Sequence, residues 1–253
     1  MAPRRATKGK SKPAFELEVV FDQLRFHTHA NKKNFETLIK DRHIWGKRQI
    51  NLHELHPFVH ENLQSRHWLS LCTNIQPPPT DLIRELYSNL SMHKDVCYGH
   101  KVTSWIRGVP FTITRDLVSD TLDVPIIRTP TYPYSESPHI DDVMDVFCGR
   151  SVTQGFDPSI SLSELTELNY IFFRIACHNI FPISHVHTIP IDRCFFFYAF
   201  VIDSSICFPS LFIETIAEVR RSKYKRHGLF FLVFIHRVLK YLGLENFPSQ
   251  ELV

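Results

Sequence analysis

The chain has 253 residues, 43% hydrophobic and 13% aromatic, which is enough to bury a core in one large domain or two modest lobes and excludes disorder throughout. Its net charge of +3 comes from the first twelve residues, which hold five cations and no acid: Arg4, Arg5, Lys8, Lys10 and Lys12. Without these five, 24 basic and 26 acidic residues remain, a balance that does not suit a body built to neutralise phosphates.

The first 14 residues are basic, small and mostly polar, with Pro13 near their end. They carry too little apolar surface to offset the entropy lost on ordering, so we predict a disordered basic tail over residues 1–14. A tail of this kind suits contact with RNA or DNA, recognition by a nuclear import receptor, or solubility alone.

Residues 15–127 are predicted to form an N-terminal α lobe that contains one β-hairpin. A short surface helix is expected at 31–40, where three apolar residues share one helical face: Phe35, Leu38 and Ile39. Pro57 suits the first turn of a second helix, because its missing N–H would be unpaired there. The buried stripe expected for that helix is Phe58, Val59 and Leu63.

Three consecutive prolines at 77–79 enforce an extended break before the most regular helical pattern of the chain. Thr80 is predicted to be the N-cap, and Asp81 lies in the first turn, where a carboxylate interacts favourably with the helix dipole. This helix should end near Ser91. Its apolar residues recur at helical spacing: Leu82, Ile83, Leu86, Tyr87 and Leu90.

β-Branched and aromatic residues at 102–106 and 109–113 predict two strands joined by a turn at 107–108, where a glycine accepts positive φ without steric cost. Pro110 lacks an N–H, which weakens the second strand or places it at an edge. The helix that follows can be capped by either of two threonines, Thr112 or Thr114.

Residues 128–160 are rich in proline and are predicted to form a linker or long surface loop between two lobes. The C-terminal helical lobe, residues 161–253, has helical periodicity throughout. Ser161 and Glu164 have the spacing of a capping box at its start, and Pro209 can begin a later helix. The expected fold is therefore mainly α: a two-lobed helical protein with a small β-hairpin in the N-terminal lobe.

Six cysteines are scattered without short-range pairing, and the N-terminal segment lacks the apolar core of a secretory signal. We therefore expect reduced thiols in an intracellular protein, nuclear or cytoplasmic. The apolar runs at 194–202 and 229–235 are much shorter than the roughly 20 residues that cross a bilayer, so no membrane contact is predicted.

Two sets of side chains contain the residue types that bind metals. The first set is His53, His56 and His60. Pro57 breaks the helical geometry of this set, and its zinc-protease pattern is incomplete. The second set is Cys72, His93, Cys97 and His100. It lacks the closely spaced cysteine pairs that structural zinc sites have. Packed or solvated roles are favoured for both sets, so no metal ligand and no cofactor is predicted.

Two acidic patterns resemble catalytic motifs without meeting their requirements. The segment 139–142 lacks the aromatic residue that precedes the paired aspartates of polymerases, so an Asp-rich helix start is favoured. In 201–205, Ser205 stands where aspartic proteases need a glycine, and Asp203 is interpreted as a cap. The sequence also has neither G-x-S-x-G nor a glycine-rich phosphate loop, so we predict no catalytic residue and expect no enzyme.

The strongest nucleic-acid-binding pattern in the folded part is the basic cluster at 220–227, which is interleaved with Tyr224. An ordinary solvated helix end, where cations favour the dipole, is the alternative for this cluster. With the tail, it supplies the predicted phosphate contacts: Arg4, Arg5, Lys8, Lys10, Lys12, Arg220, Arg221, Lys223, Lys225 and Arg226.

Several short segments, taken in order, resemble one protein family. They include Trp68, the LIRELYSNL helix at 82–90, and Arg107-Gly108 before Pro110-Phe111. Over about residues 26–242 the chain resembles the putative plant transposon protein domain, found in plant proteins derived from gypsy-type retrotransposons. The resemblance implies a mostly helical, element-derived domain with no established activity and no catalytic residues to carry over.

The resulting hypothesis is a non-enzymatic, retrotransposon-derived interaction domain, gag-like in that it associates with itself or with nucleic acid. The rival interpretations are a metal-dependent or hydrolytic enzyme of an element-encoded polyprotein, and a degenerate fragment without function. The metal content of the purified protein tests the zinc variant of the enzyme. The slope of log K against log salt tests binding to RNA or DNA.

Overall fold

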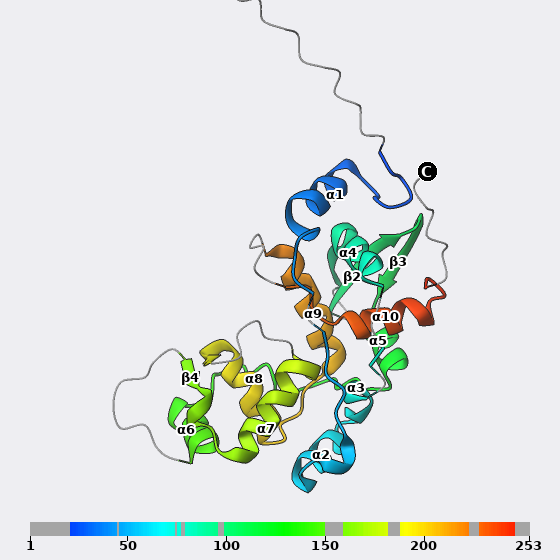
Figure 1. The fold of residues 1–253 in the computed structure, drawn as a ribbon. Coiled ribbons are helices and arrows are strands. Elements are labelled where there is room, and N and C mark those ends of the chain that lie inside the picture. The colour runs from blue at the N-terminus through cyan, green and yellow to red at the C-terminus, as the bar shows by residue number, and fades with distance from the viewer. Residues whose placement is uncertain are drawn as a thin grey trace, which may run out of the picture.

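Figure 1 shows a mainly helical structure with a small three-stranded antiparallel sheet, and the mainly α class predicted from the sequence is confirmed. The structure is a computed structural model that describes residues 21–44, 46–73, 75–76, 79–95, 99–149, 159–181, 188–222 and 228–245. Within these ranges no helix has both the length and the apolar character needed to cross a membrane. The tail predicted at 1–14 lies outside the described residues.

The described chain begins with a helix of two geometries. α1 (His29–Asn34) continues directly as a π-helical segment, η1 (Phe35–Ile39). The apolar stripe predicted for this helix is buried or half-buried against the core, so the short helix expected at 31–40 is confirmed.

Short helices follow at the lower edge of the molecule in Figure 1. They are η2 (Leu52–Glu54), α2 (Pro57–Ser65) and α3 (Leu69–Cys72), and α2 has a proline in its first turn as predicted. The predicted buried stripe of α2 is wrong at Phe58, which is 45% exposed. Because α2 lies at an edge, this ring packs edge-on against Phe172 and keeps its other side open.

The central helix is α4 (Thr80–Asn89), whose predicted apolar stripe is buried along its whole length. The predicted N-cap is displaced by one residue, because Pro79 occupies the cap and Thr80 already begins the helix. Polar residues of α4 are buried as well: Glu85, Ser88 and Asn89. The helix is therefore enclosed on most sides, unlike the usual amphipathic surface helix.

The sheet has the strand order β1 (Ser91–Asp95), β2 (Gly99–Ile106) and β3 (Val109–Ile113). The hairpin predicted for β2 and β3 is confirmed, and Pro110 lies on an edge strand. β1 was not predicted, because its sequence SMHKD has no β-branched residue. It pairs with β2 because the chain leaves α4 alongside that strand.

Two helices follow the sheet. α5 (Arg115–Leu122) is capped by Thr114, one of the two predicted caps. The segment 128–160, predicted to be a linker or loop, contains α6 (Ile140–Cys148), which is a correction. His139 and the first-turn aspartates begin α6, so the predicted Asp-rich helix start is confirmed. The helix is stable here because three of its apolar side chains are buried: Val143, Met144 and Phe147.

Further elements lie after residue 158: β4 (Ser159–Ser161), η3 (Leu162–Glu164), α7 (Glu167–Ile175), η4 (Ala176–Ile180), β5 (Thr188–Pro190) and α8 (Ile191–Val201). β4 and β5 pair antiparallel, a ribbon that the helical periodicity did not predict. The capping box predicted at Ser161 and Glu164 is present, although it caps the 3-10 turn η3 rather than α7.

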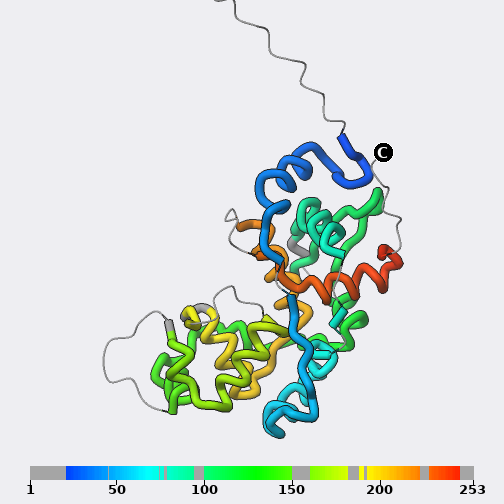
Figure 2. The backbone as a smooth tube through the Cα atoms, in the orientation of Figure 1, coloured from blue at the N-terminus to red at the C-terminus, as the bar shows by residue number. Residues whose placement is uncertain are grey.

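The last two helices are α9 (Phe208–Arg221) and α10 (Leu232–Tyr241), and Pro209 lies in the first turn of α9 as predicted. They pack against α4, α5 and β2, all of which belong to the range 15–127. Figure 2 shows these orange and red segments returning to the cyan and green ones. The division into two lobes at 128–160 stays a prediction.

Glu85 is a fully buried carboxyl group on α4. Its Oε1 accepts the backbone N–H of Arg107 at 2.7 Å, and its Oε2 lies 3.5 Å from Nε of the same arginine. Burial raises the pKa of Glu85 from 4.5 to about 7, and the two contacts with Arg107 oppose that shift. The carboxyl group thus fastens the hairpin turn to the central helix.

We expect Glu85 to make the free energy of unfolding fall as the pH rises from about 4.5 to about 7. The folded state keeps the proton at pH values where the unfolded chain has released it. This stabilisation, roughly 3 kcal/mol in all, is therefore fully present below the pKa that Glu85 has in the unfolded chain. It is lost as the pH rises through the pKa that Glu85 has in the folded state. Urea unfolding at several pH values should show that Glu85→Gln removes this dependence, whereas Glu36→Gln, an exposed control, retains it. Identical pH profiles for the wild type and Glu85→Gln would refute this assignment.

Candidate nucleic-acid interface

One of the three histidines near the start of α2 caps that helix. His56 is the N-cap of α2, and its Nδ1 accepts the N–H of Phe58 at 3.2 Å. His53 and His60 lie on either side of this cap. Throughout the ranges that the structure describes, no three metal-ligating side chains gather at one point.

The second set of metal-ligating residue types is separated by the sheet. His93 of β1 is in register with Lys101, one residue beyond His100, so the two imidazoles project from opposite faces. Cys72 is buried in α3, and burial raises the pKa of its thiol to about 12, which keeps it protonated. Cys97 lies outside the described residues.

Aspartates of both acidic patterns have ion-pair partners within the fold. Asp141 lies in the first turn of α6, 3.4 Å from the Nδ1 of His139. Asp203 follows the end of α8 rather than capping it, and its Oδ1 pairs with the guanidinium group of Arg66 at 2.9 Å. Arg66 is buried and holds this loop against α2.

The structure describes only two of the ten residues predicted to contact phosphate, Arg220 and Arg221. The five cations of the tail, and three of the cluster at 220–227, lie outside the described residues: Arg4, Arg5, Lys8, Lys10, Lys12, Lys223, Lys225 and Arg226. Arg221 is exposed at the end of α9. Arg220 is half-buried, donates from Nε to the carbonyl oxygen of Leu90 at 3.3 Å, and has a pKa lowered by burial.

A groove of about 370 Å³ lies on the face of the sheet that points away from α4. Along β2, Val102, Ser104 and Ile106 are buried and turn toward the core, so the alternate positions face outward. The groove is lined by His27, Asn89, Ser91, His93, Thr103, Ser104, Trp105, Pro110, Phe111 and Thr112. We call this surface the sheet groove.

Two stacked rings border the sheet groove. The imidazole of His27 lies 5.0 Å from the indole of Trp105, with an angle of 27° between the ring planes. The indole Nε1 donates to the carbonyl oxygen of Leu24 at 3.0 Å, which fixes the orientation of Trp105. His27 is exposed and Trp105 is half-buried, so the ring pair is fixed in place and still accessible.

Asn89, the last residue of α4, positions both rings. Its Oδ1 accepts the N–H of His27 at 3.1 Å, and its Nδ2 donates to the carbonyl oxygen of Trp105 at 2.9 Å. The same Nδ2 also contacts the carbonyl oxygens of Arg25 and Glu85. Asn89 is buried, so this network is shielded from water and holds the edge of the sheet groove rigid.

The lining of the sheet groove combines aromatic rings with hydroxyl and imidazole groups, and none of its described residues is a lysine or arginine. Among the described residues that line it, none carries a carboxylate. Lys101 stands opposite His93 in the register, and Arg220 contacts the carbonyl of Leu90, the residue next to Ser91. Aromatic rings can stack on nucleobases, and hydroxyl, imidazole and cationic groups can meet phosphates and base edges.

The sequence reasoning missed the sheet groove. The alternation along 101–106 was available, with Lys101, Thr103 and Trp105 on one face, and it places the tryptophan on the outer side. The pairing of Trp105 with His27 was not readable, because these residues are 78 positions apart and are brought together by long-range contacts such as those of Asn89.

Comparison with known sequences gives one family. The family model described as a putative plant retrotransposon-related domain matches residues 64–245, more than half of the chain. The chain therefore belongs to this family, and the resemblance seen in the sequence is confirmed. No curated protein and no solved structure matches the chain.

Proposed function

We propose that this member of the plant retrotransposon-related family is a non-enzymatic module that binds single-stranded RNA or DNA across the sheet groove. The observation that carries the proposal is the stacked pair of His27 and Trp105 at the border of a groove whose described lining has no carboxylate. Base stacking on aromatic side chains contributes about 1–3 kcal/mol per base and tolerates any sequence.

Basic residues around the sheet groove would supply the phosphate contacts. The end of α9 reaches the start of β1 through the bond from Arg220 to Leu90, so Arg220 and Arg221 lie near the β1 edge of the sheet, while α9 itself packs on the face of β2 opposite the groove. Arg220 donates from Nε to the backbone and Arg221 is exposed, so these two arginines would be the described contacts for phosphates of a strand that extends past this edge. The tail would add further phosphate contacts and hence salt dependence.

Binding of a labelled single-stranded oligonucleotide, followed by fluorescence anisotropy over a series of salt concentrations, tests this function. We expect log K to fall linearly with log salt, and the slope to become shallower when the five cations of the tail are replaced by glutamine in the full chain. A slope near zero in the unaltered chain would exclude binding through phosphates.

A carboxylate placed in the sheet groove should weaken the same binding. We expect His93→Glu to reduce affinity at least fivefold, because the new charge repels phosphates where His93 lines the groove. His93 is exposed, so the substitution should leave the fold intact. His53→Glu is the matched control, since it changes an exposed histidine on η2, outside the groove. Equal affinities for the two variants would contradict this location for the site.

A further inference from the structure

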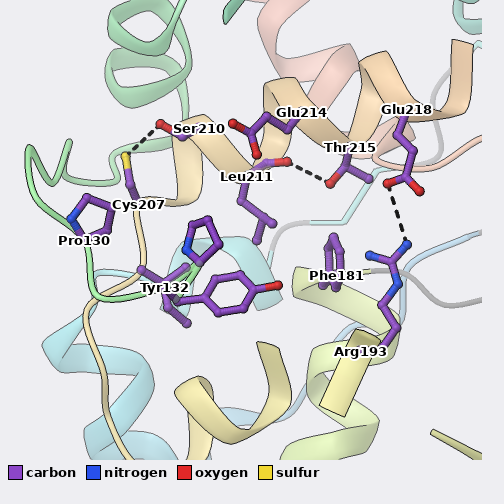
Figure 3. A pocket seen from close by; sticks show the side chains of 12 residues that line it. Pro130, Tyr132, Phe181, Arg193, Cys207, Ser210, Leu211, Glu214, Thr215 and Glu218 are labelled. Atoms are coloured by element: carbon purple, nitrogen blue, oxygen red, sulfur yellow. Dashed lines mark hydrogen bonds and ion pairs between the residues drawn. The ribbon is translucent and has the colours of Figure 1, made fainter. Parts of the chain in front are cut away.

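A second hollow, of about 180 Å³, lies where α9 passes α8 and the loop at 130–133 (Figure 3). We call it the α9 pocket. The N-cap of α9, Cys207, and one stripe of that helix at helical spacing form its first wall: Ser210, Leu211, Glu214, Thr215 and Glu218. Aromatic and proline residues with Arg193 form the opposite wall, and no residue of this lining belongs to the sheet groove.

One end of the α9 pocket already holds a guanidinium group. Arg193 rises from α8 beside Phe181, and its Cζ lies 4.2 Å from the centroid of that ring (Figure 3). Its Nη2 is 3.7 Å from Oε2 of Glu218. An aromatic face and a carboxylate together stabilise this cation.

The lining of the α9 pocket also contains a second carboxylate and a further aromatic ring, on opposite walls. Glu214 lies one turn before Glu218 on α9, and Tyr132 lines the opposite wall (Figure 3). The side chain of Glu214 is 52% exposed, and its ion-pair partner is the imidazole of His100 at 3.6 Å, which is charged only when protonated. Two carboxylates thus share the pocket with one permanent cation, Arg193, which gives it a net negative charge.

We infer that the α9 pocket binds an organic cation, a guanidinium or alkylammonium group on a short apolar stem. The charged head pairs with Glu214, and the stem packs between Leu211 and the ring of Tyr132. An anion would meet two carboxylates at this site. The aromatic and aliphatic walls favour an organic stem over a hydrated metal ion, which requires several oxygen ligands.

Such a cation has two sources with the same chemistry. It is either a free alkylguanidine or the side chain of an arginine- or lysine-rich peptide. Agmatine represents the first source. A peptide with the sequence of residues 1–13, MAPRRATKGKSKP, represents the second and is supplied by the chain itself.

Isothermal titration of the full chain with each probe tests the inference. We expect at least one probe to bind, and Glu214→Gln to weaken that binding about tenfold, because it removes the charge that pairs with the cation. Glu36→Gln removes an exposed carboxylate of η1 outside the α9 pocket and should leave the affinity unchanged.

The pattern of binding identifies the source. Tighter binding of the peptide than of agmatine, lost in Glu214→Gln, assigns the α9 pocket to a peptide side chain. Equal or tighter binding of agmatine assigns it to a free cation. Failure of both probes to bind, or equal affinities of Glu214→Gln and the wild type, overturns the inference and leaves the nucleic-acid proposal untouched.

Discussion

Replacing Trp68 by alanine should lower the free energy of unfolding by about 4 kcal/mol, the usual cost of truncating a large aromatic residue in a core. Trp68 is 1% exposed at the start of α3. Its ring lies 5.6 Å from that of Phe200 in α8 and 5.7 Å from that of Phe208 in α9. One side chain therefore fills the space between three helices, and its loss leaves a cavity that they cannot all close.

Urea unfolding followed by far-UV circular dichroism measures this effect. Phe58→Ala is the matched control, because the Phe58 ring is 45% exposed at the edge of α2, and it should cost less than about 1 kcal/mol. Trp68→Phe should fall between the two, since it retains most of the apolar volume. Similar unfolding midpoints for Trp68→Ala and Phe58→Ala would contradict the packing of α3 between α8 and α9.

Replacing Arg42 by methionine should cost about 3 kcal/mol. Arg42 is 2% exposed, and its guanidinium group donates to the carbonyl oxygens of Leu38, Val219 and Ser222, the bond to Val219 being 2.9 Å long. Methionine keeps the volume of the side chain but leaves these carbonyls without their charged donor. Figure 2 shows the blue segment after η1 running beside the orange end of α9, where Arg42 joins them.

The controls for Arg42 separate geometry from charge. Arg42→Lys keeps the charge but cannot reproduce the planar fork, so it should recover only part of the lost stability. Arg221→Met removes an exposed arginine at the end of α9 and should change stability by less than about 0.5 kcal/mol. Full stability of Arg42→Met would show that these hydrogen bonds do not join η1 to α9.

Local patterns predicted the elements whose stability is local. The apolar stripe of α4 and the glycine turn between β2 and β3 depend on residues a few positions apart, and both were read from the sequence. The cap of α5 at Thr114 belongs to the same class. Such features follow from helix and turn geometry, which neighbouring residues determine.

The sequence could not predict elements that depend on a distant partner. β1 is polar and forms because β2 pairs with it, and α6 forms within a proline-rich segment because Phe147 packs on Phe197 of α8 at 4.6 Å. The phosphate contact of Arg220 stays a prediction, and nothing in the sequence indicated that its Nε donates to the carbonyl oxygen of Leu90, 130 positions away. Long-range hydrogen bonds of this kind leave no local pattern.

The sheet groove could not be predicted from local sequence patterns either, because it also depends on contacts between distant residues. α4 was predicted as a helix with one buried face, but Glu85 and Asn89 on its other side hold the turn and the rings that border the sheet groove. The polar residues of α4 therefore act as supports for the sheet. Asn89 is a positioning residue, because it contacts the backbone of His27 and Trp105 rather than their rings.

Photo-crosslinking to a single-stranded RNA that carries 4-thiouridine, followed by mass spectrometry of the crosslinked peptides, tests the central claim most directly. We predict crosslinks at the sheet groove, in the peptides that contain His27, His93 and Trp105, and their loss in His93→Glu. Crosslinks confined to α6, α7 and α8, or an equal yield from His93→Glu and the wild type, would contradict the assignment of nucleic-acid binding to this sheet.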